Sequence, residues 1–215
     1  MSDKEALIAR IRRAFAGVEY PGDDFLRGSF DGCEPSEVVR PFRGRNDWSI
    51  IDAAFLDAQY DALSFLSEGG FRFFLPAYLI ADLQDRLQTA DPVFHLTHGF
   101  SDSSVEIPTK TRSFVRTIGM SVCVNPKRYG AMTFYDYARY RLSVFTQEEA
   151  QAIVAYLRYK RNADSHRLIT DAIDAALQVY WLDRASNAPS AARLKHHVEE
   201  EAHFVAEMEG LGERG

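Results

Sequence analysis

The chain has 215 residues and a formal net charge of −6, with 46% hydrophobic and 26% charged residues. Aromatic residues make up 13%, which argues against intrinsic disorder, because disordered sequences are poor in aromatic side chains. The negative net charge argues against nonspecific nucleic-acid binding by the whole surface.

Several features predict a cytoplasmic protein. No stretch approaches the roughly 20 apolar residues that are needed to cross a bilayer. The chain begins Met-Ser-Asp-Lys-Glu and contains no apolar signal-peptide core. Cys33 and Cys123 form no CxxC pair, and we expect both to be reduced thiols.

Helical signals dominate the first hundred residues. Ser2 and Glu5 have the spacing of a capping box, which predicts a helix that ends in the turn at 21–24. A short helix is expected between Pro35 and Val39. The apolar positions between Ile51 and Leu66 then favour one amphipathic helix.

Ser67 is placed to cap a further helix, in which apolar residues recur every three or four positions from Phe71 to Leu87. This stripe predicts a core helix, although a kinked recognition groove is an alternative. Pro76 lies within it and predicts a kink or a break, because proline has no N–H to donate. Gly69 and Gly70 predict a loosened first turn.

The middle of the chain gives weaker signals. A short helix or turn is expected after Asp91-Pro92, and a small β-hairpin or an irregular insertion around 105–135. The aromatic stretch 133–140 fits a helix or a strand equally well.

Helical periodicity returns after a second capping box, Thr146 to Glu149. Another helix is predicted from Asp164 or Ser165 to the break at 187–189, and a charged C-terminal helix at about 190–208. The expected fold is therefore mainly α, a single helical domain over 1–215 with a basic, aromatic inserted segment at about 105–141.

Three stretches of the sequence resemble the signature of an uncharacterised bacterial domain family. They are 14–24 (AFAGVEYPGDD), 62–79 (ALSFLSEGGFRFFLPAYL) and 142–149 (LSVFTQEE). The family signature is similar to LSFLSPEAFRYFLPAYL, from which this chain departs at Gly69-Gly70. The resemblance implies a helical bacterial fold and brings no activity with it.

The inserted segment holds the main candidate binding residues. Residues 107–141 contain seven basic residues and one acidic residue, Asp136, so this segment carries +6 and the remaining chain −12. Such cations could bind an acidic partner or, together with aromatic rings, single-stranded nucleic acid. Alternatively, these basic residues could neutralise the acidic charge of the remaining chain, within this subunit or in a partner. The candidate residues are Arg112, Arg116, Lys127, Arg128, Tyr129, Tyr137, Arg139 and Arg141.

Candidates for chemistry are fewer. His196, Glu200 and His203 share one helical face and are weak candidates for a metal site, since a second Glu-x-x-His is missing. Cys123 with His95 or His98 could form a Cys–His pair. The chain contains no GxxxxGK, GxGxxG or GxSxG motif.

The sequence therefore favours a non-enzymatic bacterial protein that binds an unknown protein partner, as an adaptor, a regulator or a toxin-neutralising protein. No cofactor is predicted. An enzyme with a Cys/His or metal site is one alternative, and a protein that binds single-stranded nucleic acid through residues 110–141 is another.

Overall fold

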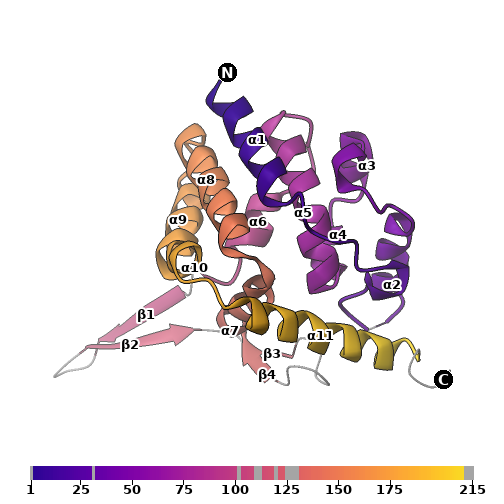
Figure 1. Cartoon of the computed structure of the whole chain (residues 1–215). Helices are drawn as coiled ribbons and strands as arrows, with labels where there is room; N and C mark the ends of the chain where they lie inside the picture. The colour runs from indigo at the N-terminus through magenta and orange to yellow at the C-terminus, as the bar shows by residue number, and fades with distance from the viewer. Residues whose placement is uncertain are drawn as a thin grey trace.

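The protein is mainly α-helical, as the sequence predicts (Figure 1). This computed structural model describes residues 2–30, 32–100, 103–108, 113–118, 121–123 and 131–210; for 103–108, 113–118, 121–123, 131–132 and 191 it describes the backbone alone. The first half contains helices α1 (Asp3–Ala14), α2 (Glu34–Val39), α3 (Ala53–Ala58), α4 (Ala62–Phe65), α5 (Glu68–Leu83) and α6 (Pro92–Thr97), with 3-10 turns η1 (Asp23–Phe25), η2 (Arg40–Phe42) and η3 (Trp48–Ile50).

The second half begins with strands β1 (Ser103–Pro108), β2 (Ser113–Ile118), β3 (Ser121–Cys123) and β4 (Ala131–Thr133). Helices α7 (Phe134–Arg141), α8 (Gln147–Ala163), α9 (Arg167–Ala176), α10 (Leu182–Ser186) and α11 (Ala191–Met208) follow, with a 3-10 turn η4 (Leu142–Val144) and a π-helical turn η5 (Leu177–Trp181).

Helix α5 is the centre of the fold. Of its 16 residues 13 are buried, which explains its near-continuous apolar sequence. The Oγ of Ser67 caps it by accepting from the N–H of Gly70 at 2.9 Å. The helix continues through Pro76, so the predicted alternative of a break is wrong.

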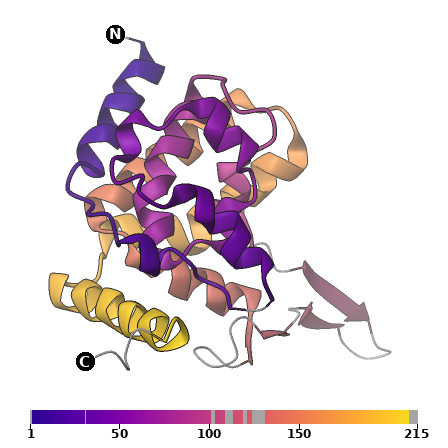
Figure 2. The same cartoon turned by 90° about the vertical axis from the view of Figure 1, so that its right-hand side faces the viewer.

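Two short antiparallel hairpins replace the irregular alternative in the middle of the chain. Strand β1 pairs with β2 in the register Ser103↔Ile118 to Pro108↔Ser113, and β3 pairs with β4 from Ser121↔Thr133 to Cys123↔Ala131. The β1–β2 hairpin projects away from the helical body in both views (Figures 1 and 2).

Helices α9 and α10 form one continuous rod through the π-helical turn η5. A π turn contains an extra residue, which changes the face that the following side chains present. Here it allows the adjacent rings of Tyr180 and Trp181 both to be buried, at 7% and 0% exposure. Trp181 donates from Nε1 to the carbonyl of Leu96 at 2.8 Å and thereby ties the rod to α6.

Helix α11 lies across one end of the helical body, beside η1, η4 and the start of α5 (Figures 1 and 2). Glu201 is 5% exposed, and its carboxylate accepts hydrogen bonds from the N–H groups of Glu68 and Gly69. The first turn of α5 is therefore fully bonded at Gly69 and Gly70, in contrast to the loosened turn that the two glycines predict.

Candidate functional site

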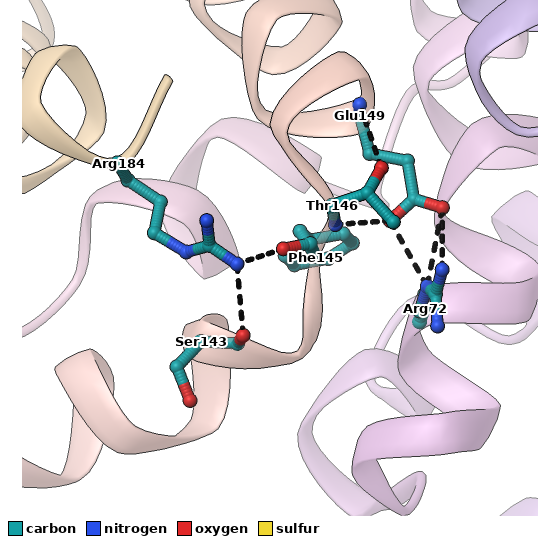
Figure 3. A network of polar contacts seen from close by, with 6 residues as sticks. All are labelled: Arg72, Ser143, Phe145, Thr146, Glu149 and Arg184. Atoms are coloured by element: carbon teal, nitrogen blue, oxygen red, sulfur yellow. Dashed lines mark hydrogen bonds and ion pairs between the residues drawn. The ribbon is translucent and has the colours of Figure 1, made fainter. Parts of the chain in front are cut away.

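The loop between η4 and α8 is held from two sides by two arginines, Arg72 and Arg184 (Figure 3). Thr146 opens α8 with a capping box: its Oγ1 accepts from the N–H of Glu149 at 3.3 Å, and a Glu149 oxygen accepts from the N–H of Thr146 at 2.9 Å. This is the box that the sequence predicts. The carboxylate that completes it is only 2% exposed, so it needs a cationic partner.

Arg72 of α5 is that partner. Its Nε lies 2.9 Å from Oε2 of Glu149 and its Nη2 lies 2.7 Å from Oε1, which is the two-pronged geometry of a strong arginine–carboxylate pair. The Arg72 side chain is 20% exposed. This pair fixes α5 against the start of α8.

Arg184 of α10 approaches the same loop from the opposite side (Figure 3). Its Nη2 donates to the carbonyl of Ser143 at 3.0 Å and to the carbonyl of Phe145. Arg184 is 5% exposed, and its Nε and Nη1 are buried without a hydrogen-bond partner among the described residues. Its positive charge therefore has no dedicated carboxylate, because Glu149 is already bound by Arg72.

The surroundings of Arg184 influence its pKa in opposing directions. Burial lowers the pKa of Arg184, whereas the nearby Tyr180 and Glu149 raise it. Tyr180 is close enough to act on this pKa, yet its hydroxyl has no partner of good hydrogen-bond geometry in the described structure. A guanidinium remains protonated near neutral pH even after a sizeable shift.

Arg184 lines an open cavity of about 420 Å³ between α7, η5, α10 and the start of α11. We call it the arginine cavity, because three arginines line it: Arg139, Arg184 and Arg193. Ser143, Tyr180 and Asp183 also line it. Asp183 accepts a hydrogen bond from Nδ2 of Asn187 at 2.8 Å. No described carboxylate forms an ion pair with any of the three arginines.

Ser143 also belongs to a second polar arrangement. Its Oγ lies 3.1 Å from Nδ1 of His197, and Nε2 of the same ring contacts a carboxylate oxygen of Glu68. Tyr140 stacks on the imidazole with ring centroids 4.7 Å apart. A smaller cavity of about 280 Å³ adjoins Tyr140, Ser143, Arg193 and His197, so Ser143 borders two cavities.

A model of one protein family matches residues 3–185. The chain belongs to the family of unknown function DUF6714. This membership confirms the predicted link to an uncharacterised family. The DUF6714 match includes Arg72, Ser143, Glu149 and Arg184 and ends before α11.

Neither the curated proteins nor the solved structures contain a match to this DUF6714 chain. None of the helices in the part that the structure describes is both long and apolar enough to cross a membrane. The predicted cytoplasmic location stays a prediction.

The structure separates the described members of the predicted basic patch. Arg139 lines the arginine cavity, and its Nη1 donates to the Tyr135 hydroxyl at 3.1 Å. Tyr137 and Arg141 instead face a different cavity of about 280 Å³, which also contains His95. Arg141 donates to the carbonyls of Leu63 and Leu66 and lies 4.6 Å from the Phe71 ring centre, so it is bound within the fold.

The other predicted binding residues cannot be placed. Arg112, Lys127, Arg128 and Tyr129 lie outside the described residues, and Arg116 lies on β2, where only the backbone is described. Binding of nucleic acid by residues 110–141 therefore stays a prediction.

The predicted metal and Cys–His candidates have the following positions. Nε2 of His196 lies 3.5 Å from Oε1 of Glu200, both side chains are well exposed, and His203 is also exposed. Within the described ranges no group of three or more His, Cys, Asp or Glu is arranged to hold a metal ion. His95 and His98 line one cavity, while Cys123 lies on β3 without a described side chain.

Sequence reasoning missed four residues that the structure brings together: Ser143, Arg184, Arg193 and His197. A signal was present for Arg184, because it follows Leu177, Tyr180 and Trp181 at helical spacing on the buried side of one helix. An arginine on an apolar stripe indicates a buried charge that requires an explanation. His197 had no comparable signal, since its partners lie 54 and 129 positions away.

Proposed function

We propose that this protein binds an acidic group of a protein partner in the arginine cavity. The observation that carries the proposal is Arg184, a residue that is 5% exposed at the wall of an open cavity and has two guanidinium nitrogens without a hydrogen-bond partner among the described residues. A buried charge without a counter-charge is costly, and an anion that enters the cavity relieves this cost.

The other groups around the cavity favour the same kind of ligand. Arg139 and Arg193 add positive charge from α7 and α11. Ser190 caps the 18-residue helix α11 at the cavity wall, so the positive end of this helix dipole also lies there. A carboxylate or phosphate can accept charge-assisted hydrogen bonds from several of these groups at once.

The rim of the cavity favours a protein segment over a free ion. Val179 is 42% exposed, and it lines the cavity together with Ala188 and Pro189. Apolar contacts beside cationic groups are typical of surfaces that bind an acidic peptide, in which the anion fixes orientation and apolar side chains add buried area.

The proposal is tested with a fluorescent hexaglutamate peptide as the probe. Arg139→Glu should weaken binding by about tenfold or more, because it replaces attraction by repulsion at a desolvated anion. Arg10→Glu is the matched control, because Arg10 is an exposed arginine on α1 that is distant in sequence from Arg139. This variant should bind the peptide as the wild type does.

Tyr137→Ala discriminates between the two cavities. Tyr137 lines the cavity that contains His95 and is absent from the arginine cavity, so this variant should retain full binding. Equal binding by wild type and Arg139→Glu, or a loss with Tyr137→Ala alone, would contradict the proposed site.

A further inference from the structure

The Ser143, His197 and Glu68 side chains form a hydrogen-bonded series of hydroxyl, imidazole and carboxylate. The exposed fraction falls along the series: Ser143 is partly exposed at two cavities, His197 is 9% exposed and Glu68 is 3% exposed. The order of groups is the one used in nucleophilic catalysis, with a partly exposed hydroxyl, a base that contacts it and a buried group that orients the base.

The contacts allow an arrangement of protons that activates the hydroxyl. When the Glu68 carboxylate is the acceptor, the Nε2–H of His197 is its donor, because Nε2 faces that carboxylate. Nδ1 is then free to accept from the hydroxyl of Ser143 at 3.1 Å. The geometry therefore places a base, His197, at hydrogen-bond distance from a hydroxyl, and Glu68 fixes the orientation of the imidazole ring.

We propose that Ser143 is a nucleophile for acyl transfer from carboxylic esters, with His197 as the general base and Glu68 as a positioning residue. The same cavity wall carries Arg139, Arg184 and Arg193, whose positive charge stabilises the negative charge that develops on the acyl oxygen. The inference goes beyond the proposed binding function and does not depend on it.

The reaction balances without any further reagent besides water. Ser143 Oγ bonds to the acyl carbon while its proton moves to Nδ1 of His197. The ester C–O bond then breaks, and the leaving alcohol takes the proton from His197. Water attacks the acyl-serine with transfer of its proton to His197 and then to Oγ, which releases a carboxylic acid and restores Ser143.

One competing acceptor faces the hydroxyl. Ser143 Oγ lies 2.7 Å from the carbonyl of Tyr140, in the turn before it, so the hydroxyl proton can be donated to this carbonyl or to His197. Ser186 provides a matched comparison, because its Oγ bonds the carbonyl of Leu182 at 3.0 Å and no histidine contact is found for it in the described structure. Activation by His197 therefore predicts reactivity at Ser143 and none at Ser186.

The test uses the full chain and a neutral fluorophosphonate probe. Such a probe reacts by forming a P–O bond to an activated serine and expelling fluoride, and the site of attachment is read by mass spectrometry of peptides. We expect stoichiometric labelling at Ser143, no labelling of Ser143→Ala, and unchanged labelling of the control Ser186→Ala. His197→Gln should slow labelling about 100-fold or more.

Glu68→Gln tests the positioning role through the form of the kinetics. It should lower the maximal labelling rate and leave the probe concentration for half-maximal rate unchanged, a split that loss of folding would not produce. An unlabelled wild type, or labelling that persists in Ser143→Ala, would overturn the assignment. Because the probe is uncharged, failure here leaves the anion-binding proposal standing, and failure of hexaglutamate binding leaves this one standing.

Discussion

Arg72 and Arg184 bind the same loop, but only one of them has its charge neutralised. Arg72 has the carboxylate of Glu149, whereas Arg184 has two backbone carbonyls. Carbonyl oxygens satisfy hydrogen bonds but carry no net charge, so the site as a whole keeps one buried positive charge. This difference between two neighbouring residues is the basis of the proposed anion site.

The Arg72–Glu149 pair can be tested by removing its negative member. Glu149→Gln keeps the side-chain length and the helix cap and leaves Arg72 without a counter-charge, so we expect a loss of about 3 kcal/mol in the free energy of unfolding. Urea unfolding followed by circular dichroism measures it. The exposed neighbour is the control, and Glu148→Gln should change stability by less than about 0.5 kcal/mol. A similar small effect from both variants would show that the pair does not stabilise the fold.

His95 predicts a pH dependence of stability. Burial, with smaller effects of Arg141 and His98, lowers the pKa of His95 to about 3, against 6.5 for an ordinary histidine. The unfolded chain thus binds a proton more readily than the folded one between these values. The contribution of His95 is complete above about pH 6.5 and is lost as the pH falls, by up to about 2 kcal/mol at pH 5.

The test compares how steeply the free energy of unfolding changes with pH in wild type and variants. Between pH 6.5 and 5 the free energy of unfolding of the wild type should decrease more steeply than that of His95→Gln, and the exposed control His166→Gln should keep the wild-type slope. Identical slopes in wild type and His95→Gln would show that His95 titrates normally in the folded state.

At the scale of single elements, α7 shows what the sequence could not decide. In a strand, residues 137, 139 and 141 would share one face, whereas in a helix 137 and 141 share a face that 139 does not. The stretch forms a helix, so Arg139 enters the arginine cavity while Tyr137 and Arg141 face another. The helical conformation therefore places the described members of the predicted basic patch in two different cavities.

Other elements follow from the sequence to different degrees. The capping boxes at Ser2 and Thr146 occur as predicted, because their hydrogen bonds join residues only three apart. The single helix expected between Ile51 and Leu66 is instead two short helices, α3 and α4. The chain turns between them at Gln59, whose carbonyl accepts from the hydroxyl of the buried Tyr78 at 2.8 Å. A tertiary contact of this kind leaves no trace in local periodicity.

The first turn of α5 depends on Glu201 of α11. Its carboxylate accepts from the N–H groups of Glu68 and Gly69. These N–H groups lie in the first turn of α5, where an α-helix offers no backbone carbonyl to accept from them. Glu201→Ala should therefore weaken docking of α11 by about 1.5–3 kcal/mol, the usual contribution of a charged hydrogen bond. We expect faster hydrogen exchange at the Glu68 and Gly69 amides and faster tryptic cleavage within α11.

The adjacent Glu200 supplies the control. It is exposed and contacts His196 one turn away on the same helix, so Glu200→Ala should leave the exchange of both amides unchanged. Equal exchange in all three proteins would mean that another interaction caps α5.

At the scale of the whole molecule, α11 lies outside the main hydrophobic core cluster. The core cluster is built from α1 to α10 and the segments between them, and it includes no residue of α11 among those described. The helix is attached by the buried Val205, which is 1% exposed, by the edge-to-face rings of Phe30 and Phe204, and at its C-cap by the ion pair Arg27–Glu209 at 3.0 Å. The DUF6714 match likewise ends before α11 begins.

This organisation predicts that the core folds without α11. A chain that ends at Asn187 should keep its helical circular dichroism and a single cooperative thermal transition, because Val205 is the one buried hydrophobic residue that it loses among those described. Its Tm should fall by several degrees, since the bonds from Glu201 and His197 to the start of α5 are lost. Differential scanning calorimetry of both chains measures the shift. Loss of the cooperative transition would show instead that α11 is an integral part of the folding unit.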